Sequence, residues 1–386
     1  MNKSSILTCA LAIGCLQACA GHSIDLDQGA SPAPNGTDPV GVDVIQLPDS
    51  ISYLGADDAR VYWTTPKSVG YAGAVLASSV AQSCVFDQCN KTLVSYGPMQ
   101  PPLTIGRQDV FFASANPYPS GRLVGCPKAG CGAAPNGIFE DPGVPEADAV
   151  DDQYLYWSSD EDIYRCPLTG CTGEVPEVVA KDETTNSGLI VDGDTVFWTF
   201  AVDASDPNGE TQIHSAPKDG SRPPTLIANG VRLSPNALNF TVDGTNVYWL
   251  DSSSHVQSCA RTGCNGEAPV TLVATDGAKQ ALRVDATGLY WLETAAPGIS
   301  SSSAWASAPS ERGAEVDVSV RFCPLTGCSN DADVHVLTAS KAGHFAMSSK
   351  YLYWDEPEFL PENGTYAYGD NAYGDNKQIF RLAKPE

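Results

Sequence analysis

The chain is poor in long hydrophobic runs and in basic side chains. Its apolar run near the N-terminus, Ile6–Ala18, is shorter than the roughly 18 residues that a transmembrane helix needs, and no later run approaches that length. The 22 Lys and Arg residues are scattered among 46 Asp and Glu residues, and the net charge of −24 becomes −25 once residues 1–18, with Lys3, are removed. Nucleic acids and anionic lipid surfaces are held by clustered basic residues. We therefore expect no nucleic-acid partner.

Sequence signatures of enzymes are also scarce. The five histidines are spread along the chain, and H-E-x-x-H, G-x-S-x-G and phosphate-binding glycine loops do not occur. The segment Asp203–Glu210 partly resembles a calcium loop through Asp206 and Asn208, but Ala204 and Ser215 occupy the first and twelfth ligand positions. We therefore predict no metal site, no cofactor and no catalytic residues, although carboxylates that folding brings together could still form a site.

The first residues have the pattern of an exported lipoprotein. Lys3 precedes the apolar run, which is typical of a signal peptide covering residues 1–18. The segment Leu16-Gln17-Ala18-Cys19 resembles a bacterial lipobox, in which the cysteine carries the lipid and becomes the first residue of the mature chain. We predict lipidation at Cys19, with an ordinary secretory signal as the alternative.

The segment after the predicted anchor is suited to a flexible linker. Residues 19–41 are rich in Pro, Gly, Ser and Asp and have few apolar side chains to bury. The membrane is then contacted through the lipid only. Ala20 after the cysteine favours the outer membrane by analogy with bacterial lipoproteins, and the sequence leaves open which side of it the protein occupies.

An aromatic triplet recurs about every 48 residues, a period in the range of propeller blades. Each copy has an aliphatic residue followed by two aromatic residues, the second of which is Trp in all but one: Val61-Tyr62-Trp63, Val110-Phe111-Phe112, Leu155-Tyr156-Trp157, Val196-Phe197-Trp198, Val247-Tyr248-Trp249, Leu289-Tyr290-Trp291 and Leu352-Tyr353-Trp354. An Asp six residues before the second aromatic opens a turn in five copies, at Asp57, Asp151, Asp192, Asp243 and Asp285.

Each repeat contains four short segments that are rich in Val, Leu, Tyr or Trp and bounded by turn residues, which predicts four strands. The last repeat is one strand short, and Asp43–Leu47 resembles the fourth strand of the repeat before it, Asp333–Leu337. A strand borrowed from the N-terminus would close the ring and remove its open edge. We therefore predict an all-β fold over residues 42–386, a seven-bladed β-propeller of four-stranded antiparallel blades, with the N-terminal strand completing the last blade.

These repeats resemble the YWTD-type propeller repeats of the low-density-lipoprotein receptor class, here in a bacterial lipoprotein. The Tyr-Trp pair is present in five copies, and the similarity covers residues 42–386. The fourth position of the motif, two residues after the tryptophan, varies between copies, and the blade count differs from the six of that family. The resemblance therefore implies the propeller architecture alone.

Ten of the 13 cysteines form five Cys-x4-Cys pairs: Cys84 and Cys89, Cys126 and Cys131, Cys166 and Cys171, Cys259 and Cys264, and Cys323 and Cys328. The fourth repeat has Ala216 and Ser221 at the two positions, and this joint absence favours a bond within each motif. Export also favours oxidation. We predict five local disulfides, each fixing the turn after a third strand, with a structural zinc site as the alternative.

The longest loops are expected between second and third strands, on the face opposite the Asp and Cys turns. In the sixth and seventh repeats they carry Trp305, Tyr366, Tyr368 and Tyr373, which are candidate binding residues because loops on a rigid scaffold often bind ligands. We therefore expect a monomeric, non-enzymatic binding or scaffold module for a protein or glycan. The alternative is a propeller hydrolase or lyase that acts on envelope or extracellular polysaccharide.

Overall fold

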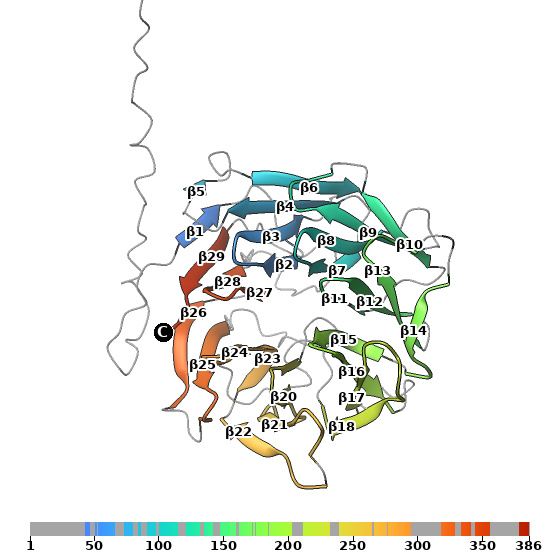
Figure 1. Ribbon diagram of the computed structural model, residues 1–386. Coiled ribbons are helices and arrows are strands. Elements are labelled where there is room, and N and C mark those ends of the chain that lie inside the picture. The colour runs from blue at the N-terminus through green and yellow to red at the C-terminus, as the bar shows by residue number, and fades with distance from the viewer. Residues whose placement is uncertain are drawn as a thin grey trace, which may run out of the picture.

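The strands surround a central axis in a computed structural model of the chain (Figure 1). The structure describes residues 43–46, 51, 53–65, 73–79, 84–85, 91–97, 100–114, 121–131, 135–141, 147–159, 162–171, 173, 175–183, 185–202, 211–231, 239–264, 266–275, 277–294, 318–328, 333–340, 344–355 and 378–385. Within these ranges, no helix is long and apolar enough to cross a membrane.

Six sheets are four-stranded antiparallel blades, whose first strand lies toward the centre of the ring and whose fourth strand lies at its outside (Figure 1). Blade I has β2 (Tyr53–Ala56), β3 (Arg60–Thr65), β4 (Gly73–Ser79) and β6 (Lys91–Gly97), and blade II has β7 (Gln100–Ile105), β8 (Asp109–Ser114), β9 (Gly121–Pro127) and β10 (Asn136–Asp141). Blade III has β11 (Ala147–Val150), β12 (Tyr154–Ser159), β13 (Asp162–Pro167) and β14 (Glu177–Ala180), and blade IV has β15 (Thr185–Asp192), β16 (Thr195–Ala201), β17 (Thr211–Pro217) and β18 (Thr225–Asn229). Blade V has β19 (Phe240–Val242), β20 (Asn246–Leu250), β21 (Val256–Ala260) and β22 (Val270–Val273), and blade VI has β23 (Ala278–Val284), β24 (Gly288–Thr294), β25 (Val318–Pro324) and β26 (His335–Ser340).

The remaining sheet, which we call the closing sheet, joins the two ends of the chain. It contains β27 (Phe345–Met347), β28 (Tyr351–Asp355) and β29 (Gln378–Ala383), followed by β1 (Asp43–Gln46) and β5 (Cys84–Val85). Strand β1 is antiparallel to β29, with Asp43 opposite Arg381 and Gln46 opposite Gln378. Strand β5 is parallel to β1, so the closing sheet is mixed and five-stranded.

The predicted seven-bladed propeller of four-stranded antiparallel blades is therefore wrong, because the described residues form six such blades. The difference arises in blade I. There Ser78 pairs with Val61, the register position that Cys126 takes opposite Val110 in blade II. The first cysteine pair thus does not follow directly on the third strand, and Cys84 instead belongs to the strand that extends the closing sheet.

The two aromatics of each triplet pack in opposite directions, because successive residues of a strand point to opposite faces of the sheet. Tyr62 packs with Phe112 of blade II, whereas Trp63 packs with Tyr353 of the closing sheet. The same alternation recurs around the ring, and the six tryptophans of the repeats are all fully buried: Trp63, Trp157, Trp198, Trp249, Trp291 and Trp354. The core of the molecule is thus a set of apolar layers between neighbouring sheets.

Four of the predicted disulfides are present, with Cα–Cα distances between 5.1 and 5.9 Å: Cys126–Cys131, Cys166–Cys171, Cys259–Cys264 and Cys323–Cys328. Disulfide bonding is confirmed for these pairs, whereas Cys89, and with it the fifth bridge, lies outside the described residues.

The turns that contain these cysteines also contact the preceding blade. The backbone N–H of Cys171 donates to the carbonyl of Ile138 in blade II at 3.0 Å, and that of Cys328 donates to the carbonyl of Leu272 in blade V at 2.8 Å. In blade IV, which has no bridge at this turn, Gly220 has a φ of 67° and a Cβ there would lie 2.7 Å from the carbonyl oxygen of Val178. Each turn therefore joins two blades, with or without its disulfide.

Candidate functional site

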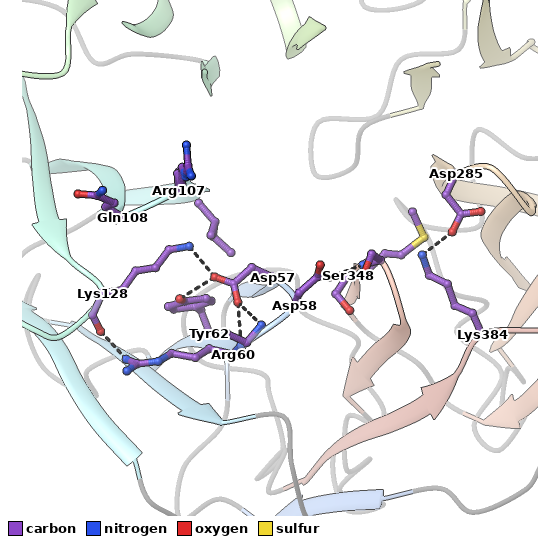
Figure 2. Close-up of a pocket in the computed structure, with 15 residues that line it drawn as sticks. Asp57, Asp58, Arg60, Tyr62, Arg107, Gln108, Lys128, Asp285, Ser348 and Lys384 are labelled. Atoms are coloured by element: carbon purple, nitrogen blue, oxygen red, sulfur yellow. Dashed lines mark hydrogen bonds and ion pairs between the residues drawn. The ribbon is translucent and has the colours of Figure 1, made fainter. Parts of the chain in front are cut away.

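A cavity of about 960 Å³ opens on the face that carries the Asp turns, between blades I, II and VI and the closing sheet (Figure 2). Its lining comes from turns between first and second strands and from the ends of third strands. The lining residues are Asp57, Asp58, Ala59, Arg60, Tyr62, Ile105, Gly106, Arg107, Gln108, Lys128, Asp285, Met347, Ser348, Ser349 and Lys384.

Asp57 organises the blade I turn at this cavity. Its Oδ1 accepts hydrogen bonds from the backbone N–H groups of Ala59 at 2.8 Å and Arg60 at 2.7 Å, and its Oδ2 accepts one from the hydroxyl of Tyr62 at 2.9 Å. An aspartate that bonds the amides two and three residues ahead holds a tight turn. The same carboxylate therefore links the turn to the aromatic core beneath it.

A basic side chain from the next sheet completes each end of the cavity. The Nζ of Lys128, which follows the third strand of blade II, lies 2.5 Å from Asp57 Oδ2. The Nζ of Lys384 in the closing sheet lies 2.5 Å from the Oδ2 of Asp285 in blade VI (Figure 2). Both lysines and both aspartates are largely buried. These ion pairs connect neighbouring sheets at the cavity wall.

The same arrangement continues around this face. Lys218 Nζ of blade IV lies 3.1 Å from Asp151 Oδ2 of blade III, and Arg261 of blade V pairs with Asp192 of blade IV. Asp243 of blade V bonds its own turn and Tyr248, but the equivalent position in blade VI is a leucine, Leu325, so no cation reaches it from that position. The Asp turn thus occurs in five of the seven repeats, and among the described residues an inter-blade ion pair is present at four of these five.

The pairing keeps the cavity aspartates ionised. Burial alone would raise the pKa of Asp57, but hydrogen bonds from Lys128, from the backbone amides and from Tyr62 outweigh it and hold this pKa below its ordinary value of 3.8. The pKa of Asp285 is lowered in the same way, because bonds from Lys384 and Thr287 outweigh the effect of burial. At neutral pH the wall of the cavity therefore carries fixed charges.

Other polar groups of the cavity are more accessible to a ligand. The Arg107 side chain is 78% exposed, and its only ion pair among the described residues is a long one, 3.8 Å to Asp152. Gln108, from the same turn, also lines the cavity (Figure 2). Asp58 accepts a hydrogen bond from the backbone N–H of Ser349 at 2.7 Å, and this residue is exposed to solvent. The cavity thus offers donors and an acceptor around a rigid, charge-paired wall.

Two further polar clusters lie toward the opposite ends of the strands. Glu183 Oε2 accepts hydrogen bonds from Trp198 Nε1 at 3.0 Å and lies 2.7 Å from His214 Nδ1. The Lys279 side chain is fully buried, and its Nζ lies 3.5 Å from Glu293 Oε2. Among the residues that the structure describes, no three His, Cys, Asp or Glu side chains are grouped as a metal ion would require.

The binding residues predicted from the loops, Trp305, Tyr366, Tyr368 and Tyr373, lie outside the described residues, as does Cys19. Sequence reasoning missed the cavity, although a signal was present. A basic residue stands two positions after the first cysteine position of several repeats: Lys128, Lys218, Arg261 and Lys384. Aligning it with the aspartate of the preceding repeat would have suggested a contact between blades.

Comparison with known proteins places the chain at the level of fold. No protein-family model matches the chain. No curated protein matches it either. Among solved structures, the chain is similar to the β-propeller domain of the Trilobed protease from Pyrococcus furiosus, with a TM-score of 0.52 and 10% identity over 80% of this chain and 91% of that one. It is also similar to the WD40 repeats of RRP9, with a TM-score of 0.50 and 9% identity over 92% and 99% of the two chains. The chain folds as a β-propeller.

A third similar structure is a prolyl endopeptidase, with a TM-score of 0.53 and 12% identity over 82% of this chain and 49% of that chain. At such low identities a structural likeness shows the fold of this propeller and carries no function across. The resemblance to YWTD-type repeats has no family-model match behind it and stays a sequence-based prediction.

Proposed function

We propose that this protein is an exported, lipid-anchored lipoprotein whose propeller is a non-enzymatic binding or scaffold module for a protein or glycan. The observation that carries the proposal is the cavity on the Asp-turn face, whose wall is held by ion pairs between neighbouring sheets. Side chains such as Arg107, Gln108 and Asp58 supply its accessible polar groups. A preformed polar cavity on a rigid scaffold binds without a large ordering cost.

The strong negative charge of the chain supports the same function. A net charge of −24 keeps an exported protein soluble and disfavours polyanionic partners. The cavity itself is nearly balanced in charge, because its lining contains four basic residues and three aspartates. We propose that the partner contributes a polar, weakly charged segment to this cavity, and that the aromatic loops of the opposite face form a second contact.

Crosslinking in cells, followed by capture and mass spectrometry, tests the binding function. The full chain is compared with the double variant Arg107→Ala and Gln108→Ala, which changes accessible cavity groups and leaves the inter-blade ion pairs in place. Arg222→Ala is the matched control, because Arg222 is an exposed arginine in blade IV outside the cavity. We expect one partner to be lost with the double variant and retained with the control.

A second variant lacking residues 296–316 separates the two faces. Loss of the partner with this deletion and retention with the cavity variant would move the binding site to the loop face. Parallel binding to purified envelope polysaccharides, with an assay for new reducing ends, covers the enzymatic alternative. Turnover of a bound glycan would replace the binding function with that of a hydrolase or lyase.

The lipid anchor has its own test. Replacing Cys19 by Ser removes the proposed acylation site. We expect the wild-type chain to incorporate an alkyne-labelled fatty acid and to fractionate with membranes, and Cys19→Ser to do neither. Membrane association of Cys19→Ser would contradict anchoring through this residue.

A further inference from the structure

One innermost strand carries a charged side chain at a position where its equivalents are neutral. The register places one residue of each first strand opposite the first aromatic of the triplet. Those residues are Gly55, Thr104, Ala149, Ile190, Thr241, Arg283 and Ala346. Arg283 of β23 is thus a single basic exception among small or apolar neutral residues. Packing alone does not require an arginine here, because a residue as small as glycine occupies the equivalent position in blade I.

The backbone of β23 is also irregular just before this arginine. The pairing of β23 with β24 shifts register between Gln280 and Arg283. Within the bulge, Ala281 has a φ of 54°, a conformation that residues with a Cβ adopt rarely. Bulges are known to redirect side chains from a regular strand. Arg283 follows this bulge directly and returns to the regular register opposite Tyr290.

The guanidinium of Arg283 has little to offset its charge. Its Nη1 donates to the carbonyl of Leu282 at 2.9 Å, and among the described residues it makes no ion pair with a carboxylate. Burial lowers the pKa of Arg283, and the titratable side chain that favours its charge is Tyr53 of β2, a phenol. In contrast, Arg165 pairs with Glu177 and Arg261 pairs with Asp192. Arg283 is partly shielded from water, and a shielded guanidinium without an anion is unfavourable, so an anionic ligand is the expected partner.

Arg283 lies next to the cavity. It is the second-to-last residue of β23, and Asp285, a cavity residue, begins the turn that follows this strand. Strand β23 is an innermost strand of the ring (Figure 1), and the phenol of Tyr53 that acts on Arg283 belongs to another innermost strand. Arg283 therefore lies on the inner side of the ring and close in the chain to the cavity wall at Asp285.

We propose that Arg283 binds the C-terminal carboxylate of a partner polypeptide that enters through the cavity. This inference rests on the proposed binding function and names the partner group that this site recognises. A guanidinium presents a planar set of donors that matches a carboxylate, and capture of a chain terminus is a common mode of peptide recognition. The accessible groups of Arg107 and Gln108 contact the peptide behind its terminus.

The charge of the molecule selects a peptide terminus over an acidic glycan. A C-terminus brings a single negative charge into a cavity that already contains Asp57, Asp58 and Asp285. A polyuronate brings one negative charge with every sugar to a chain whose net charge is −24, and the repulsion grows with its length. One arginine compensates one carboxylate.

The test measures fluorescence anisotropy with the full propeller chain and a pool of fluorescent hexapeptides of mixed sequence ending in a free carboxylate. The same pool with C-terminal amides is the matched ligand, and oligogalacturonate is the glycan probe. We expect the carboxylate pool to bind at least tenfold more tightly than the amide pool. We also expect Arg283→Gln to remove this difference and Arg283→Lys to keep part of it. Arg222→Gln, in an exposed blade IV turn, is the control and retains the full difference.

Thermal unfolding shows whether the variants are folded. Arg283→Gln loses no ion pair among the described residues, so we expect its melting temperature to equal or exceed that of the wild type. Equal binding of the two peptide pools, an unchanged preference in Arg283→Gln, or preferential binding of oligogalacturonate would each overturn the inference. The crosslinking experiment separates this inference from the proposed function. If one of these three results is obtained but the double variant Arg107→Ala and Gln108→Ala loses the crosslinked partner, the binding function stands and the role of Arg283 fails.

Discussion

Replacing the turn aspartates Asp57 and Asp243 by asparagine separates the contribution of an inter-blade ion pair from that of the turn. Both carboxylates accept two backbone amides and a tyrosine hydroxyl of their own blade. Asp57 has in addition the ammonium of Lys128 at 2.5 Å, whereas the residue at the equivalent position for Asp243 is Leu325. Asparagine keeps one oxygen acceptor and removes the charge. The difference between the two variants therefore reports on the ion pair.

The size of that difference follows from how far the pair is shielded from water. The side chains of Lys128 and Asp57 are 17% and 23% exposed, which places them between a surface pair worth about 0–1 kcal/mol and a charged hydrogen bond worth about 1.5–3 kcal/mol. We expect Asp57→Asn to lower the free energy of unfolding by about 1 kcal/mol more than Asp243→Asn does. A double-mutant cycle with Lys128→Met should return a coupling of about the same size.

Urea unfolding followed by the fluorescence of the buried tryptophans measures these values, with midpoints compared at constant slope. The pKa of Asp57 in the folded protein is below its ordinary value of 3.8, so the unfolded chain binds the proton more readily. The stabilisation is therefore complete above pH 3.8 and is lost as the pH falls through the lowered native pKa. Equal effects of the two variants, or a coupling near zero at pH 7, would refute the account of the cavity wall as an ion-paired structure.

Three further predictions concern the repeats themselves. Burial raises the pKa of Tyr248 to about 12, above its ordinary value of 10.0, so the protonated phenol stabilises the fold below pH 10.0 and this stabilisation is lost as the pH rises toward 12. Absorbance at 295 nm should show that Tyr248 ionises together with unfolding, and ionisation near pH 10.0 in the folded protein would contradict its burial. Gly220→Ala should destabilise the protein by roughly 2 kcal/mol more than Gly193→Ala. The φ angles of the two glycines are similar, 67° and 61°, but of the two only Gly220 would bring a Cβ against a neighbouring blade. Equal shifts of the melting temperature in the two variants would argue against docking of the Gly220 turn on that blade. Replacing Cys166 by Ala and Cys171 by Ser copies the unbridged blade IV turn and should leave a folded protein whose free energy of unfolding in urea is lower by about 2 kcal/mol. Failure of this variant to fold would show that the turn needs its bridge to dock on the preceding blade.

Much of the architecture could be predicted because the repeat is visible in the sequence. The aromatic triplet and the four strand-like segments of each unit require no knowledge of distant contacts, since alternation along a strand depends only on local geometry. The Cys-x4-Cys pairs are equally local, and four of them are bonded as expected. Blade I was the exception. Its third strand ends at Ser79, before the cysteines, and the composition of this segment does not show that Cys84 pairs with β1.

The candidate site was less predictable because it is built between repeats. Asp57 and Lys128 are 71 residues apart, and the pairing of one unit's turn with the next unit's third strand depends on how the blades stack. Arg283 looks like one more scattered basic residue until the register aligns it with Gly55 and Thr104.

The amino-acid sequence by itself determined that the chain is acidic, built from aromatic β repeats and equipped with local cysteine pairs, because these properties depend on composition and on neighbours a few residues apart. Tertiary structure decided the number of four-stranded blades, the extension of the closing sheet by β5 and the meeting of charged side chains at the cavity. These features depend on which strand edges pair and which turns converge when the ring closes, and that is set by packing between blades across long stretches of chain.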